Sequence, residues 1–140
     1  MSAAGVLHHH LAAFGAGDTD EILTDYTEAS ILMTPTGTIA GLAALREAFD
    51  GFFAGLFAPG TYEFVLDGER TEDDVAMIWW HAACEQALIP FGTDTFVLRH
   101  GRIAVQTFAA KVDPALRVPA RRCSVSPNDR SPPPGGAAAS

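Results

Sequence analysis

The chain has 140 residues, of which 48% are apolar, 19% charged and 9% aromatic, and its formal net charge is −8. This length suits one domain with a sizeable core, and no apolar run reaches the roughly 20 residues that a membrane helix needs. The acidic balance argues against a nucleic-acid-binding protein, because phosphate contacts require clustered lysines and arginines.

Charge and composition divide the chain into two parts. Residues 1–113 hold five cationic side chains against sixteen carboxylates, whereas residues 114–140 hold four arginines against one aspartate. The second part is rich in proline, glycine and alanine and has almost nothing to bury. We therefore expect a folded domain over 1–113 and a disordered tail over 114–140. Two cysteines without a disulfide framework, and no pattern of a secretory signal, lead us to expect a cytoplasmic protein.

The first half of the domain has mainly helical patterns. Apolar residues spaced by three and four predict a first helix that Gly17 ends. Asp18 is followed three residues later by Glu21, the pattern of a capping box at the start of a short helix. The expected elements are helices over 4–16, from Asp18 and over 42–57, and short strands over 30–34 and 38–40.

The second half has strand patterns throughout. The expected strands cover residues 61–70, 75–89, 93–99 and 102–111, with a bend at Pro90–Gly92. Helices followed by consecutive strands predict an α+β fold, in which helices pack on one face of an antiparallel sheet. Residues 75–83 are apolar at successive positions, which indicates that both faces of this strand are covered.

Five strings share their order and spacing with a known superfamily. They are His10–Asp18, Tyr26–Gly37, Gly41–Arg46, Phe91–Phe96 and Arg99–Ile103. Together they resemble the nuclear transport factor 2-like superfamily, most of all its SnoaL-like and ketosteroid-isomerase-like branches, from about residue 4 to residue 113. The resemblance implies a cone-shaped half-barrel, in which a strongly curved antiparallel sheet wraps around three N-terminal helices and encloses a pocket.

The superfamily has several functions and a common way of pairing. It includes isomerases, polyketide cyclases, dehydratases, epoxide hydrolases and non-catalytic domains, so the fold alone does not give the function. Many relatives are homodimers that pair through the outer face of the sheet. We expect that face to carry Ile78, Trp80, Val97 and Val105, and a second copy to cover them.

Ketosteroid isomerases carry catalytic groups at three positions that this chain can be compared with. The carboxylate base before a Pro-x-Gly turn corresponds to Thr34, which cannot act as a carboxylate. The tyrosine donor of the first helix corresponds to His10, and the protonated carboxylic acid corresponds to Asp94. Because only the last position is kept, the resemblance argues against a faithful steroid isomerase.

Asp94 is the strongest catalytic candidate. Apolar neighbours flank it, and burial would raise its pKa so that it can donate a proton near neutral pH. Met77, Trp79 and His81 share one strand face, which the resemblance places inside the cone, and this makes His81 a candidate proton-transfer partner. The alternatives are a structural carboxylate bonded to backbone N–H groups and a histidine held by another partner.

The expected pocket lining is mainly aromatic, which suits a small, flat, apolar ligand. The expected substrate-binding residues are Phe14, Tyr26, Thr34, Phe49, Phe53, Met77, Trp79, Phe96 and Phe108. Consecutive helical positions point about 100° apart, so His8, His9 and His10 cannot share one ion and we expect no metal. No sequence motif indicates another cofactor.

Two functions fit these observations best, and a protein-transport or scaffold domain, as in the superfamily's namesake, is a third and weaker interpretation. The first is a cofactor-free isomerase, cyclase or dehydratase that moves a proton on a small apolar carbonyl compound, with Asp94, His81 and His10 as catalytic residues. The second is a non-catalytic domain for small-molecule binding or dimerisation, which the missing base at Thr34 supports. An enzyme predicts that Asp94 and a histidine face each other across an open pocket, whereas a structural domain predicts that aromatic side chains fill it.

Overall fold

A computed structural model describes residues 2–114 of the chain. Its elements are α1 (Ala3–Gly15), α2 (Thr19–Leu23), β1 (Tyr26–Thr34), β2 (Gly37–Ala40), α3 (Leu42–Ala54), β3 (Tyr62–Glu72), β4 (Val75–Cys84), β5 (Ala87–Arg99) and β6 (Arg102–Pro114). The tail predicted over 114–140 lies outside the described residues, except for Pro114, which ends β6. No helix within 2–114 is long and apolar enough to cross a membrane.

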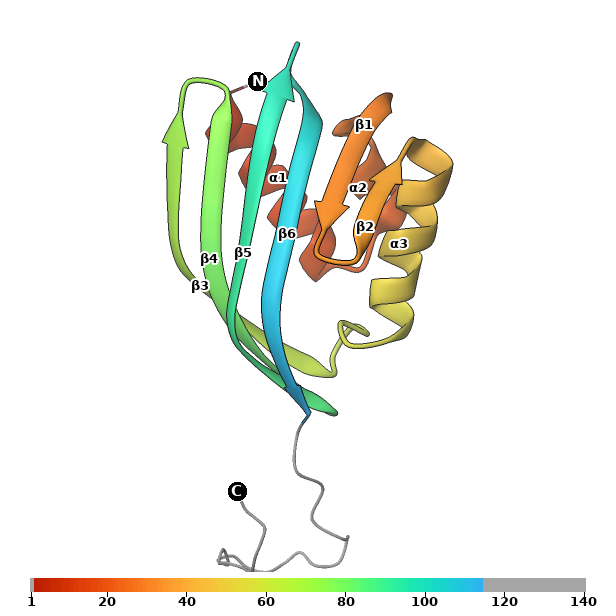
Figure 1. The fold of residues 1–140 in the computed structure, drawn as a ribbon, viewed down its shortest axis with the longest axis vertical. Helices are drawn as coiled ribbons and strands as arrows, with labels where there is room; N and C mark the ends of the chain where they lie inside the picture. The colour runs from red at the N-terminus through yellow and green to blue at the C-terminus, as the bar shows by residue number, and fades with distance from the viewer. Residues whose placement is uncertain (1, 115–140) are drawn as a thin grey trace, which may run out of the picture.

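The six strands form one curved sheet in the order β2-β1-β6-β5-β4-β3. Strands β3 to β6 are the predicted antiparallel meander, and β1 joins β6 in parallel. Figure 1 shows the long strands bending along their length, with α1 and α2 behind the sheet and α3 beside β1 and β2. The predicted α+β half-barrel is confirmed, because three helices cover the inner face of an open, curved sheet.

The ends of α1 and α2 follow from their local sequence. Gly17 adopts a positive φ of 67°, which lets the chain leave α1 and turn back. Asp18 then accepts a hydrogen bond from the backbone N–H of Glu21 at 3.0 Å, so the predicted cap of α2 is confirmed. These two turns hold α1 across the inner face of β3 and β4.

The turn between β4 and β5 differs from the prediction. The chain reverses at Glu85–Gln86, and Pro90–Gly92 lies inside β5. Both ladders of β5 shift register near Pro90, with β4 between Trp80 and Ala82 and with β6 between Leu88 and Phe91. Because proline has no N–H for a ladder hydrogen bond, a bulge accommodates it within a strand.

The predicted orientation of β4 is also wrong. Ile78 and Trp80 face inward and are 2% and 3% exposed, whereas Met77 faces outward and is 41% exposed. Ile78 lies directly opposite Asp94 in the antiparallel ladder, and opposite residues share a face of the sheet. Since the strand is apolar on both faces, its periodicity could not decide which set is buried.

Candidate functional site

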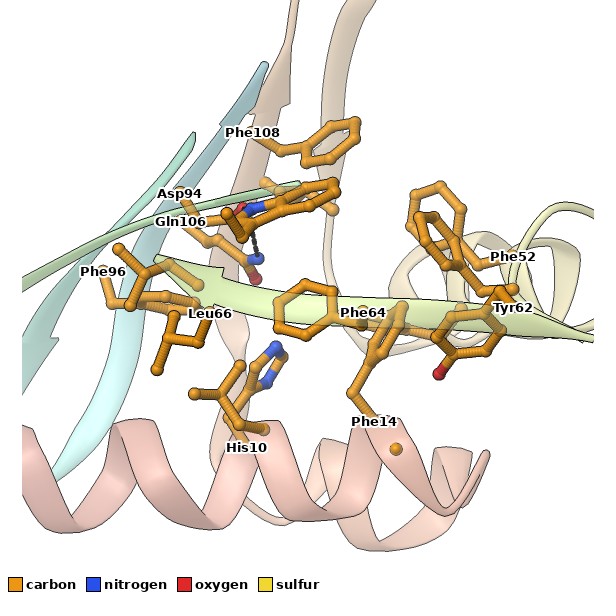
Figure 2. Close-up of a pocket in the computed structure, with 17 residues that line it drawn as sticks. His10, Phe14, Phe52, Tyr62, Phe64, Leu66, Asp94, Phe96, Gln106 and Phe108 are labelled. Carbon is orange, nitrogen blue, oxygen red and sulfur yellow. Dashed lines mark hydrogen bonds between the residues drawn. The ribbon is translucent and has the colours of Figure 1, made fainter. Parts of the chain in front are cut away.

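A cavity lies between α1, α3 and the inner face of the sheet. Its volume is about 310 Å³, the lower end of the range for sites that bind small molecules. Figure 2 shows aromatic side chains from the helices and from the strands around it. Seven phenylalanines form much of this lining: Phe14, Phe49, Phe52, Phe57, Phe64, Phe96 and Phe108. The cavity therefore suits a mainly apolar ligand, and the polar side chains among its lining are His10, Tyr62, Trp80, Asp94 and Gln106.

Asp94 provides the carboxylate of this cavity. It lies on β5 and is 7% exposed. Its Oδ1 accepts a hydrogen bond from Trp80 Nε1 at 2.9 Å, and its Oδ2 accepts one from Gln106 Nε2 at 2.8 Å. Burial raises the pKa of Asp94 to about 6, although both hydrogen bonds lower it. No lysine or arginine of the described residues forms an ion pair with this carboxylate.

His10 reaches the cavity from the opposite side, on α1. It is 4% exposed and packs among aromatic rings, the nearest of them Phe96 with a centroid distance of 5.1 Å. Burial lowers its pKa to about 4, and His9 lowers it further by charge repulsion. His10 is therefore a neutral imidazole at neutral pH.

Tyr26 and Gln106 connect these two titratable groups. The Tyr26 hydroxyl donates to Gln106 Oε1, and the same hydroxyl oxygen lies 3.5 Å from His10 Nδ1. Burial raises the pKa of Tyr26 well above its usual range, and the nearby Asp94 charge adds to this shift. A continuous set of polar groups thus runs from α1 to β5 behind an otherwise apolar cavity.

Most of the predicted site residues lie at or next to this cavity. Those that line it are His10, Phe14, Phe49, Asp94, Phe96 and Phe108. Tyr26 is fully buried behind His10, and Phe53 packs against Phe14 with a centroid distance of 5.0 Å. The structure therefore brings Asp94 and one of the two predicted catalytic histidines to the same cavity.

The other predicted catalytic histidine, His81, lies elsewhere. It points away from the cavity on the outer face of β4, where its Nδ1 is 2.8 Å from Asp67 Oδ2. The predicted pair of His81 with Asp94 is wrong, because the two residues face opposite sides of the sheet. A histidine–carboxylate pair does exist here, but it is solvent-exposed and remote from the cavity.

Three predicted substrate-binding residues are also outside the cavity. Met77 and Trp79 share the outer face with His81, and the Arg70 guanidinium lies 6.0 Å from the Trp79 ring centre. Thr34 stabilises the turn after β1, where its hydroxyl donates to the Gly37 carbonyl at 3.1 Å. Their positions explain this: Met77 and Trp79 lie at outward-facing positions of β4, and Thr34 is the last residue of β1, next to the hairpin turn.

Sequence reasoning missed three polar residues that line the cavity, Tyr62, Trp80 and Gln106. Trp80 was expected on the outer face, although its indole N–H is the donor that holds Asp94. Gln106 pairs directly with Phe96 in the β5–β6 ladder and therefore shares its inward face. Gln106 and Phe108 are two residues apart and therefore lie on the same face of the strand. A polar residue on the face predicted to line the pocket was the signal that could have identified Gln106.

The remaining histidines of α1 lie outside the cavity. His9 lies between two carboxylates, with Nδ1 2.5 Å from Asp25 and Nε2 2.6 Å from Glu21, and these hydrogen bonds raise its pKa. His8 pairs with Glu69 at 2.9 Å. Within residues 2–114, no group of three or more histidine, cysteine or acidic side chains is placed to hold a metal ion.

Comparisons with known proteins agree with this architecture. Solved structures with the same fold include a nuclear transport factor 2-like protein of unknown function from Burkholderia xenovorans, which is 17% identical with a TM-score of 0.66 and covers 89% of this chain and 93% of its own. A protein assigned as a ketosteroid isomerase from Kribbella flavida is 13% identical, with a TM-score of 0.67 and coverage of 94% and 90%. A protein assigned as a polyketide cyclase from Sinorhizobium meliloti is 15% identical, with a TM-score of 0.63 and coverage of 74% and 93%.

At these identities the solved structures show the fold alone, and no curated protein matches the chain. The family model described as a SnoaL-like domain matches residues 7–106, a span that includes most of α1, all of α2 and α3, and every cavity-lining residue except Phe108. The chain therefore belongs to the SnoaL-like domain family, within the nuclear transport factor 2-like superfamily.

Proposed function

We propose that the cavity binds a small apolar carbonyl compound and that Asp94 exchanges a proton with it. The reaction class is the one expected from the sequence: isomerisation, cyclisation or dehydration, with no cofactor in the proton transfer. Asp94 is the catalytic residue, and His10 is its partner across the cavity. Relatives assigned as a ketosteroid isomerase and a polyketide cyclase share this fold, which is consistent with the proposal.

One observation carries this proposal: a buried carboxylate faces an apolar cavity without a cationic partner among the described residues. Its pKa of about 6 means that the ionised form predominates at neutral pH, while the protonated form is close in free energy. A group in this balance can accept a proton from a carbon acid and return it. The proton moves from the carbon next to the carbonyl to a carboxylate oxygen of Asp94, and the same oxygen then delivers it to another position.

The test is hydrogen exchange on an apolar ketone of suitable size. We expect the protein to accelerate deuterium incorporation next to the carbonyl of β-tetralone in heavy water, followed by proton NMR. Asp94→Asn keeps the shape of the side chain but replaces one acceptor oxygen with an NH2 group, and we expect it to reduce exchange to the buffer rate. Asp67→Asn, on the outer face, is the matched control and retains the full rate. Equal exchange in the Asp94→Asn and wild-type proteins would remove Asp94 from the mechanism.

A non-catalytic binding domain is the second candidate. Both oxygens of Asp94 already accept hydrogen bonds, from Trp80 and Gln106, so the carboxylate also has a structural role. The position matched to the isomerase base, Thr34, lies in a turn and supplies no base to the cavity. This alternative predicts that β-tetralone binds, as seen by NMR shifts of cavity residues, without any faster exchange.

We also propose that two copies pair through the outer face of the sheet. The strand register places four apolar residues in one row across β4, β5, β6 and β1, namely Val75, Val97, Val105 and Ile31. Val75 is 38% exposed, and a second copy would cover this row. Val97→Lys is expected to convert a dimer to a monomer in analytical ultracentrifugation. A monomeric wild-type protein would overturn this proposal.

A further inference from the structure

One nitrogen of His10 has no hydrogen-bond partner among the described residues. Nδ1 lies 3.5 Å from the Tyr26 hydroxyl oxygen, whereas Nε2 forms no hydrogen bond with residues 2–114. The side chain is 4% exposed and lines the cavity. Figure 2 shows its ring rising from α1 toward Gln106 and the strands that carry Asp94. A buried polar atom without a partner is costly, which makes Nε2 a contact point for a ligand.

The chemistry of each neighbour determines which His10 nitrogen carries the proton. The amide nitrogen of Gln106 donates to Asp94 Oδ2, so the amide oxygen of Gln106 faces Tyr26. An amide oxygen can only accept, and the single hydroxyl proton of Tyr26 must therefore point to it. The Tyr26 oxygen is then left as an acceptor toward His10 Nδ1.

A neutral imidazole carries one proton, on either Nδ1 or Nε2. Because the Tyr26 oxygen can only accept from this side, the contact with Nδ1 forms when Nδ1 is protonated. Nε2 is then the bare nitrogen, with its lone pair available in the cavity. Each contact from His10 through Tyr26 and Gln106 to Asp94 therefore has a fixed donor and a fixed acceptor. This order favours the tautomer of His10 that carries its proton on Nδ1.

We infer that His10 is held as the Nδ1–H tautomer and that its bare Nε2 selects ligands carrying a hydroxyl donor, such as a phenol or an enol. This inference rests on the proposed function, because it names the ligand class of the same cavity. The Trp80 N–H and one Gln106 N–H are already bonded to Asp94, so they offer no donor to a ligand. The second N–H of Gln106 remains, and a hydroxyl can accept from such a group while it donates to Nε2. An ether supplies no proton for Nε2, and a carbonyl compound supplies one only in its enol form, so the enol is the form of the proposed substrate that Nε2 would favour.

The tautomer is tested first, on the full chain without any ligand. Nitrogen-15 NMR of histidine-labelled protein distinguishes protonated from bare ring nitrogens, and His10→Phe assigns the signals. We expect a protonated Nδ1 and a bare Nε2 at neutral pH. Tyr26→Phe removes the acceptor oxygen and is expected to shift His10 toward the Nε2–H form. An Nε2–H tautomer in the wild-type protein would overturn the inference and would leave the proposed function untouched.

Ligand selection is tested next, with β-naphthol and its methyl ether as a matched pair. Their apolar rings are the same, and only the first can donate a hydrogen bond. We expect the naphthol to bind about tenfold more tightly, the usual effect of one hydrogen bond in a buried site. His10→Phe should reduce this preference to about twofold or less, whereas His8→Gln, an outward histidine on the same helix, should keep it.

The outcomes separate the two proposals. Equal affinity for both probes, with the expected tautomer, overturns hydroxyl selection but leaves a ligand-binding cavity. No binding of either probe or of β-tetralone overturns the proposed function, and the inference fails with it. A preference for the naphthol that survives in His10→Phe would assign the selection to Asp94 and overturn the role of His10.

Discussion

Two adjacent tryptophans lie on opposite faces of the sheet, so the two faces can be compared directly. Trp80 lies in the cavity, is 3% exposed and donates to Asp94, whereas Trp79 lies on the outer face beside Arg70. Each indole packs over a glycine of a neighbouring strand, Trp80 over Gly92 and Trp79 over Gly68. Both tryptophans are therefore packed against a neighbouring strand in the same way. What differs is the environment: one indole serves a buried carboxylate, and the other covers an open surface.

The two faces can also be compared through the histidine and carboxylate that each of them carries. On the outer face, His81 and Asp67 are in contact and about half-exposed. Inside, His10 and Asp94 are buried, separated by Tyr26 and Gln106, and shifted in pKa in opposite directions. A direct contact is thus not a property of the pair that we propose to be functional. Burial and an apolar cavity change the chemistry of a titratable group more than an exposed partner does.

The largest expected effect comes from filling the two glycine positions. A Cβ at Gly92 would lie 2.4 Å from the Trp80 ring, and one at Gly68 would lie 2.3 Å from the Trp79 ring. We expect Gly92→Val to lower the free energy of unfolding by about 3–4 kcal/mol, because the enclosed indole cannot move away. Gly68→Val should cost about 1 kcal/mol, because Trp79 can swing toward solvent. Urea denaturation of both variants measures the difference, and equal losses would contradict the comparison.

The second prediction uses the opposite pKa shifts of Asp94 and His10. Between pH of about 4 and 6, folded Asp94 holds a proton that the unfolded chain has released, so its contribution to stability falls as pH rises. Between pH of about 4 and 6.5, unfolded His10 holds a proton that the folded protein lacks, so its contribution falls as pH decreases. Each contribution is about 3 kcal/mol, and the two nearly cancel in the wild-type protein.

Single substitutions should reveal each slope. We expect Asp94→Asn to lose stability as pH falls from about 6.5 to 4, and His10→Phe to lose stability as pH rises from about 4 to 6. Urea titrations at stepped pH measure both slopes, and the difference from the wild type removes the contribution of surface groups. Parallel pH profiles in all three proteins would show that neither group is shifted by burial.

Much of this fold follows from the sequence, for identifiable reasons. Asp18 and Gly17 mark helix ends by their own backbone chemistry, and the order of elements resembles one superfamily. Asp94 stands out because a carboxylate with apolar neighbours on a strand is unusual. These signals depend only on residues that are close together in the chain, so they can be recognised in one sequence.

The face of β4 and the turn before β5 could not be predicted in the same way. Residues 75–83 are apolar on both faces, so a shift of one residue changes the cavity-facing set without changing the pattern. Pro90 indicated a bend, but register shifts on both sides of β5 accommodate it. Gln106 becomes meaningful only through contacts with Tyr26 and Asp94, which lie 80 and 12 residues away in the chain.

The third prediction replaces each tryptophan with phenylalanine. Trp80→Phe removes the N–H donor to Asp94, and because that hydrogen bond lowers the carboxyl pKa, we expect the pKa to rise above about 6. The loss of a hydrogen bond to a buried charge should also cost about 1.5–3 kcal/mol at neutral pH. Trp79→Phe should leave the Asp94 pKa unchanged. Carboxyl-carbon NMR follows the titration, and a rise in both variants would indicate a general loss of packing.

The smallest expected effect is that of His81→Gln, which tests the orientation of β4. The His81 side chain is 46% exposed and that of Asp67 is 36% exposed, and such surface pairs contribute little to stability. We expect the free energy of unfolding to change by less than about 0.5 kcal/mol and the exchange of β-tetralone to stay at the wild-type rate. If His81 faced the cavity, its removal would slow exchange as Asp94→Asn is expected to do. A normal rate in His81→Gln beside a lost rate in Asp94→Asn would therefore assign the proton chemistry to the inner face alone.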